Sequence, residues 1–170
     1  LVVSVAACNT APTPIQAPFW QGTVKFSIDE GSDDTWVTEG PVTWIKEENP
    51  ELAPLNGGAS YIIQSGSLTA TRRGEGDGCS VKMDTTLTLK PGDGSLTVYP
   101  SGSYVGRILA TTPSLATYSC PGLPTVTAYD ALFIDLEMKG QVDSDLRMKG
   151  TMVPRGGGVT FTGSWDFFAK

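Results

Sequence analysis

Apolar and polar residues alternate along most of the chain, and this alternation is the pattern of half-buried β-strands. In the segment 81–90, the odd positions are mainly Val, Met and Leu, whereas the even positions are Lys, Asp and Thr. In the segment 20–28, Trp20, Val24 and Phe26 share one side with Ile28. Because successive side chains of a strand point to opposite faces of a sheet, each segment predicts a strand with one face in the core.

The same reasoning predicts ten short strands joined by turns rich in Gly, Pro and Asp. They cover 20–28, 35–46, 61–71, 81–90, 96–99, 104–112, 115–120 and, in a C-terminal meander, 132–138, 146–152 and 159–167. Gly40-Pro41 predicts a bulge or an edge, and Pro113 predicts a break between two strands. The pattern favours a single all-β domain of about nine or ten strands, either a closed or nearly closed antiparallel β-barrel or a two-sheet β-sandwich.

The N-terminus carries a recognisable motif. Residues 1–7 are mostly apolar and end in two alanines, and Cys8 follows them. Val5-Ala6-Ala7-Cys8 resembles the lipobox of bacterial lipoproteins, which implies cleavage before Cys8 and a diacylglycerol group on its thiol. We therefore expect a signal-peptide remnant over 1–7, a lipid-anchored, Pro-rich tether over 8–18 and the all-β domain over 19–170. The alternative is a first strand in which Cys8 is an ordinary buried thiol.

A lipid on Cys8 also explains the odd number of cysteines. The chain has three, so Cys79 and Cys120 would remain to form a disulfide, as expected in an oxidising compartment. The alternative is a cytosolic protein with two buried free thiols.

Charge and composition exclude several classes of function. The net charge of −6 argues against a nucleic-acid partner and against adsorption of the domain to an anionic membrane surface. The chain contains no His, which removes Ser-His-Asp and Cys-His nucleophile systems and the commonest zinc and haem sites. Zinc bound by cysteine alone needs four thiolates, one more than the chain has. We therefore expect no cofactor.

The acidic turn 29–34 is a weak candidate for calcium, because closely spaced carboxylates supply the oxygen ligands that this ion prefers. Its members Asp29, Asp33 and Asp34 do not have the spacing of a known calcium loop. A solvated hairpin tip explains the same residues, so no metal site is predicted here.

Paired carboxylates beside aromatic rings are a further candidate, for glycoside cleavage. The segment 36–51 combines two tryptophans with four acids, Glu39, Glu47, Glu48 and Glu51. Because a chain with 18 acids produces such neighbours by chance, we expect a protein that is not an enzyme.

Aromatic residues give the best indication of a binding surface. Trp20, Trp36, Trp44 and Trp165 lie mostly on apolar strand faces, where we expect core packing. Residues near strand ends or on polar strand faces are instead candidates for partner binding. These are Tyr99, Tyr104, Tyr118 and Tyr129 among the tyrosines, and Phe133 and Phe168 among the phenylalanines.

Together these features predict a non-catalytic, lipid-anchored, extracytoplasmic β-domain that serves as an accessory or structural subunit of a cell-envelope complex, in the periplasm or at the cell surface. Its partners would be the membrane, through the lipid on Cys8, and a protein. A lipocalin-like carrier of a small ligand is the alternative, although the large inward side chains would fill a small barrel. A carboxylate-based, glycan-active enzyme is less favoured.

Overall fold

The computed structural model describes residues 13–170, except 32, 50–53, 55 and 156–157. A short 3-10 turn, η1 (Pro14–Gln16), precedes nine strands in this part of the chain. The strands are β1 (Phe19–Asp29), β2 (Thr35–Lys46), β3 (Ala59–Gly76), β4 (Cys79–Leu89), β5 (Gly94–Val98), β6 (Ser103–Ser119), β7 (Val126–Gln141), β8 (Arg147–Arg155) and β9 (Thr160–Ala169). All their pairings are antiparallel.

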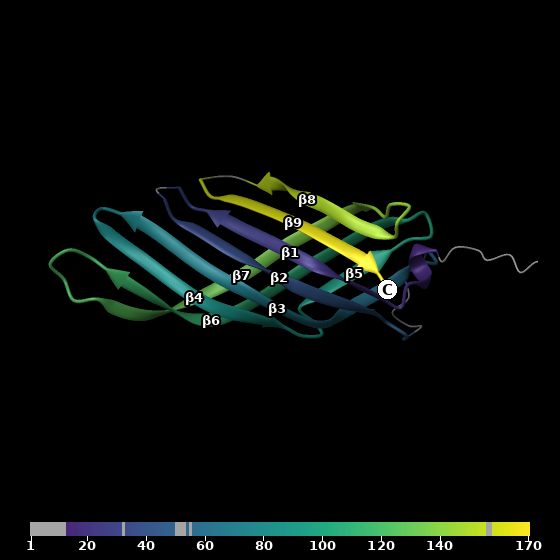
Figure 1. Cartoon of the computed structure of the whole chain (residues 1–170), viewed down its shortest axis with the longest axis horizontal. Helices are drawn as coiled ribbons and strands as arrows, with labels where there is room; N and C mark the ends of the chain where they lie inside the picture. The colour runs from purple at the N-terminus through teal and green to yellow at the C-terminus, as the bar shows by residue number, and fades with distance from the viewer. Residues whose placement is uncertain (1–12, 32, 50–53, 55, 156–157) are drawn as a thin grey trace, which may run out of the picture.

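The strands form a small closed barrel with further strands packed outside it. Strands β4 and β5 each pair with both β3 and β6, so the four pairings close a ring. The sheet continues from β3 through β2, β1 and β9 to β8, and β7 pairs with β6 on the other side. The two outermost strands, β7 and β8, contact each other. Figure 1 shows the resulting elongated molecule, in which the front and back strands cross. The predicted antiparallel barrel is therefore confirmed.

The inward faces of the strands form one continuous apolar core. Its largest members are fully buried, and they include the cross-strand partners Trp20 and Trp44. The edge of Tyr61 packs on Trp20, with ring centroids 6.4 Å apart. All four tryptophans are core residues, as their positions on apolar strand faces predict.

Strand β6 is longer than predicted because Pro113 does not interrupt it. Pro113 pairs with Ala131 of β7 inside the ladder. On the opposite side, β6 pairs with β5 as far as Ile108 and with β4 only from Thr117. The missing N–H of Pro113 therefore lies in a gap between two partner strands, where no ladder hydrogen bond is lost. The two strands expected over 104–112 and 115–120 are therefore a single strand in the structure.

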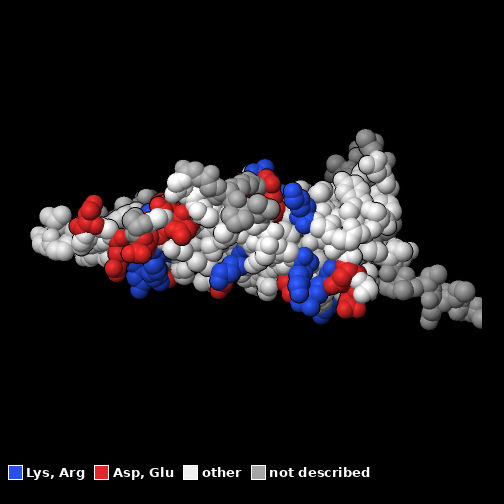
Figure 2. Space-filling view, turned by 90° about the horizontal axis from the view of Figure 1, so that it is seen from above, with Lys and Arg blue, Asp and Glu red and all other residues white. Residues whose placement is uncertain are grey.

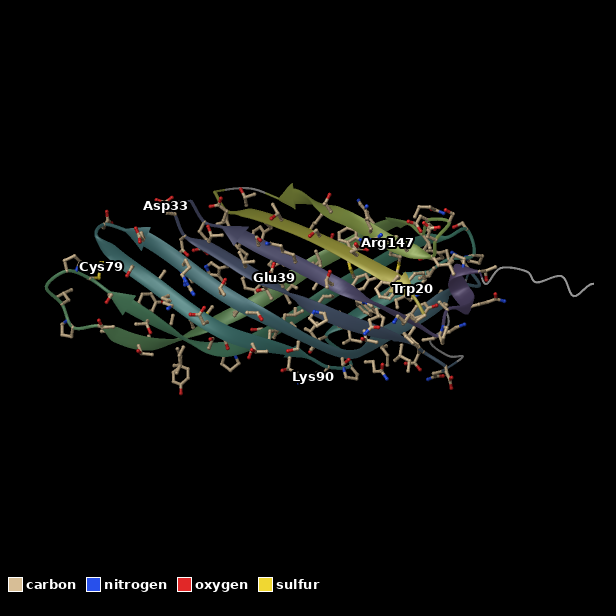
Figure 3. The ribbon with its side chains drawn as sticks, viewed as in Figure 1. Trp20, Asp33, Glu39, Cys79, Lys90 and Arg147 are labelled. Atoms are coloured by element: carbon tan, nitrogen blue, oxygen red, sulfur yellow. A yellow bond between two sulfur atoms is a disulfide. The ribbon has the colours of Figure 1, made fainter. Side chains whose placement is uncertain are left out.

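The disulfide between Cys79 and Cys120 is present, with Cα atoms 4.2 Å apart. It joins the start of β4 to the turn after β6. Figure 3 shows Cys79 at the end of the molecule that lies opposite η1. We call this end, which holds the β1–β2, β3–β4 and β6–β7 turns, the distal end. In the described part of the chain, no helix has the length and apolar character needed to cross a bilayer.

Candidate functional site

Exposed apolar side chains gather on one hairpin. Among the residues that the structure describes, ten large apolar or aromatic ones are exposed, and eight of these belong to β6, β7 or the turn between them. The eight are Val105, Leu109, Leu115, Tyr118, Leu123, Val126, Tyr129 and Phe133. Because monomeric proteins seldom concentrate exposed apolar side chains in one element, this hairpin is the strongest candidate for a binding surface.

The end of this hairpin projects beyond the barrel at the distal end (Figure 1). We call its five exposed large apolar or aromatic residues the tip: Leu115, Tyr118, Leu123, Val126 and Tyr129. Leu115 faces Tyr129 across the ladder, and Tyr118 faces Val126, so apolar side chains occupy both faces of the ribbon. Tyr129 is 86% exposed and Leu123 is 67% exposed. The stretch 108–129 contains no charged residue.

Several contacts hold the tip in place. The disulfide ties the turn of the tip to β4, and Ser80 to Lys82 of β4 pair with the end of β6. Within the turn, the Leu123 amide donates to the Cys120 carbonyl (3.2 Å), and the Ser119 and Thr125 hydroxyls lie 2.8 Å apart. A partner would therefore meet a largely pre-organised surface, which lowers the entropic cost of binding.

An ion cluster centred on Arg72 supports the base of the tip. The Arg72 guanidinium stacks on Trp36, 4.5 Å from the ring centroid. It donates to Asp34 through Nε and Nη2 and to Asp130 of β7 through Nη1 (2.7 Å). The Tyr118 hydroxyl also donates to Asp130 (3.4 Å). The hydrogen bonds to Asp34 raise the pKa of Arg72, so its positive charge is retained. The cluster joins the β1–β2 turn, β3 and the base of the tip.

The three acids of the weak calcium candidate do not converge. Asp34 binds Arg72, whereas an Asp29 carboxylate oxygen accepts from the Gly31 amide at 2.9 Å. Asp33 is exposed, with a positive φ of 61°. Among the described residues, no group of three or more His, Cys, Asp or Glu side chains is placed to hold a metal ion.

The tyrosine candidates separate into surface and core residues. Tyr104 is only 2% exposed, and its hydroxyl accepts a 2.8 Å hydrogen bond from Nε1 of Trp165. Burial raises the pKa of Tyr104. Tyr104 is therefore a core residue, in contrast to the exposed position expected from its place near a strand end. Tyr99 is half-buried in the turn before β6. Tyr118 and Tyr129 belong to the tip.

Phe133 and Phe168 are similarly exposed but have different neighbours. Phe133 is 36% exposed, and its ring lies within 6.4 Å of those of Phe26, Trp36 and Phe161, measured between centroids. These neighbours belong to β1, β2 and β9, so Phe133 of β7 packs against the part of the sheet that continues outside the barrel. Phe168 is 41% exposed, and the Lys170 ammonium lies 5.4 Å from its ring centroid. Partner binding by either residue stays a prediction.

Glu39 and the two tryptophans proposed for a sugar site lie on opposite faces of β2. Glu39 points outward and forms an ion pair with Lys25 (3.1 Å), whereas Trp36 and Trp44 are buried. Figure 3 shows Glu39 in the middle of the front strands. Glu39 and Lys25 also line a depression of about 980 Å³ that extends over β1, β2, β3, β8 and β9.

The other acids of that group add nothing to a sugar site. Glu47 accepts from the Asn49 amide, Glu48 is exposed, and Glu51 lies outside the described residues. Trp36 and Trp44, the two tryptophans of this segment, are core residues and do not form a platform beside these carboxylates.

Sequence reasoning missed three members of the tip: Leu115, Leu123 and Val126. The sequence signal that could have identified them is the stretch 108–129, which contains no charged residue. Elsewhere in the chain, charged side chains occur among the exposed positions of the strands. Cys8, the predicted lipid-bearing residue, lies outside the described residues. Comparison of the chain with models of protein families, with curated proteins and with solved structures found no match.

Proposed function

We propose that this chain is a non-catalytic, extracytoplasmic β-domain, held at a bacterial membrane by a lipid on Cys8, and that it acts as an accessory subunit of a cell-envelope complex. The observation that carries this proposal is the concentration of exposed apolar side chains on the β6–β7 hairpin. An exposed apolar surface of this kind lowers the solubility of a protein unless a partner covers it, and it is typical of a protein-binding site.

Two other features support the proposal. The Cys79–Cys120 disulfide is typical of proteins that fold in oxidising compartments. The inward positions hold large side chains, and Trp20, Trp44, Tyr61, Tyr104 and Phe167 are all at most 2% exposed. A barrel filled in this way serves better as a rigid scaffold than as a container.

The test is purification of the native protein from its host's membranes in a mild detergent, followed by mass spectrometry. We expect a lipid-sized added mass on the fragment that begins at Cys8, together with a protein partner in stoichiometric amount. The matched variant Cys8→Ser should appear in the soluble fraction. An unmodified Cys8 in the native protein would overturn the anchor, and elution without any partner would overturn the accessory role.

A small-ligand carrier is the second candidate, and one observation favours it. The indole nitrogens of Trp20, Trp36 and Trp44 are buried without a hydrogen-bond partner, and a polar guest would satisfy them. The large side chains of the core leave little room for such a guest. Native mass spectrometry of the purified domain distinguishes the two candidates, because a carrier would retain a bound small molecule.

A further inference from the structure

We infer that the tip is the docking site for a protein whose contact surface is apolar and bordered by Lys and Arg. This inference rests on the proposed accessory function and adds the surface and the chemistry of the partner. It follows from three features of the distal end: the exposed apolar residues of the tip, the acidic residues at the same end and the orientation of the tip in the molecule.

Acidic side chains lie in two turns at the same end of the molecule as the tip. The described ionisable side chains of the distal end include three cations, Arg72, Arg73 and Lys82, which form ion pairs with Asp34, Asp84 and Asp130. Five further acids at this end give it an excess of negative charge, and we call them the acidic collar: Asp29, Glu30, Asp33, Glu75 and Asp77. Of these, Glu30 also lies 3.6 Å from the Arg72 guanidinium. Figure 2 shows red acidic side chains gathered next to the uncharged white end of the molecule.

The part of the collar on the β3–β4 turn is close enough to the tip to act on the same partner. The β3–β4 turn, which carries Glu75 and Asp77, packs against the turn of the tip, because a Cβ added to Gly78 would lie 3.8 Å from Cγ of Pro121. Cys79, at the end of that turn, is bonded to Cys120. A surface with an apolar centre and a negative border selects a partner with an apolar centre and a positive border.

The charges and the orientation disfavour other occupants. Two copies of the chain that met tip to tip would bring two acidic collars together, which costs free energy through like-charge repulsion. Anionic lipid would be repelled in the same way. Moreover, the chain enters the domain through η1 at the opposite end (Figure 1). A tether that leads to a membrane from that end would turn the tip away from the lipid.

The test uses the full-length, membrane-anchored protein, a double variant of the tip and a control variant elsewhere. Leu123→Asp with Val126→Asp alters the tip. Ile45→Asp introduces the same charged side chain at an apolar position that is 37% exposed on β2, outside the β6–β7 hairpin. The partner that co-purifies with the wild type is identified, purified and titrated against each protein. Near-UV circular dichroism checks that each variant is folded. If the Asp variant of the tip does not fold, the milder double variant Leu123→Ser with Val126→Ser replaces it.

We expect the tip variant to raise the dissociation constant of the purified partner at least about tenfold, whereas the control variant leaves it within about twofold. Glu75→Lys should weaken binding, and Glu48→Lys, at the opposite end, should not. Binding should also weaken as salt increases. Equal binding by all variants would overturn the tip as the docking site and leave the accessory function standing, whereas absence of any partner would overturn both.

Two further outcomes would replace the protein partner by another occupant. Flotation of the unlipidated domain with phosphatidylcholine or phosphatidylglycerol vesicles, lost in the tip variant, would identify the tip as a lipid-binding element. A dimer of the wild type in size-exclusion chromatography, lost in the tip variant, would identify a second copy as the occupant. Either result contradicts the inference.

Discussion

At the scale of single residues, close backbone contacts make glycine necessary at particular strand positions. Gly22 lies in β1 opposite Phe167 of β9. A Cβ built on Gly22 would lie 1.9 Å from the Asp166 carbonyl oxygen and 2.7 Å from the Phe167 Cα atom. These contacts are with backbone, which cannot rotate away as a side chain can. The close approach of β1 to β9 therefore depends on the absence of a side chain at this position.

We predict that Gly22→Ala lowers the free energy of unfolding by about 2 kcal/mol or more, because β9 must shift to make room. The control is Gly76→Ala at the end of β3, where an added Cβ meets no atom within 4 Å and the expected change is within about 0.5 kcal/mol. Urea denaturation of both variants measures the difference. Equal stabilities would show that the contact between β1 and β9 relaxes without cost.

At the scale of elements, the β6–β7 hairpin combines a structural part with an exposed part. Near Phe133, β7 packs against the part of the sheet that continues outside the barrel, where this ring contacts β1, β2 and β9. Further along the hairpin, the tip leaves the barrel and exposes its apolar side chains. One pair of strands can therefore pack onto the sheet and present a surface, because the pairing of β6 with β4 and β5 anchors it on one side.

We predict that Phe133→Ala lowers the free energy of unfolding by about 2 kcal/mol, less than for a fully buried Phe because the ring is partly exposed. Phe168→Ala should cost below about 1 kcal/mol, because that ring has similar exposure and only a cation contact. Thermal and denaturant unfolding of the two variants test this contrast. If Phe133→Ala leaves stability unchanged, the contacts of its ring with β1, β2 and β9 do not stabilise the fold, which contradicts the prediction.

At the scale of the whole molecule, the disulfide links parts of the chain that are distant in sequence. Cys79 and Cys120 are 41 residues apart, and the loop between them contains most of β4, all of β5 and all of β6. Closing this loop restricts the unfolded chain, and it also fixes the turn of the tip to the barrel.

We predict that Cys79→Ala with Cys120→Ala lowers the free energy of unfolding by roughly 4 kcal/mol, the amount expected for closure of a loop of this length. A reducing agent should destabilise the wild type to a similar extent and leave the double variant unchanged, which controls for side effects of the substitutions. The melting temperature with and without reductant is the measurement. A reductant-insensitive wild type would contradict the stabilising role of the bond.

Most of the fold could be predicted from the sequence, because strand alternation depends on which side chains face the core. The segments 20–28 and 35–46 agree with β1 and β2 to within about one residue. The predicted strand boundaries were wrong where the alternation of apolar and polar residues gave no guide. Pro113 suggested a break that the neighbouring strands make harmless, and residues 126–131 showed no alternation because both faces of that ribbon are largely exposed.

The candidate site was less predictable than the fold. Tyr118 and Tyr129 were among the sequence candidates, but Tyr104 had the same signal and lies in the core. A position near a strand end does not determine burial, because burial depends on which strand crosses above it. Similarly, Glu39 and Trp36 are neighbours in sequence, but they point to opposite faces of β2.

The sequence alone therefore determined the all-β class and the inward positions of the four tryptophans, because both follow from local alternation. The pairing of Cys79 with Cys120, which the structure contains, was expected only through the resemblance of Val5-Ala6-Ala7-Cys8 to a lipobox, which assigns the third cysteine to a lipid. Only the tertiary structure decided that apolar residues of β6 and β7 form one exposed tip, that Arg72 supports its base and that two acidic turns lie at the same end. These features join segments that are far apart in the chain, and such contacts arise only when the sheet wraps around its core.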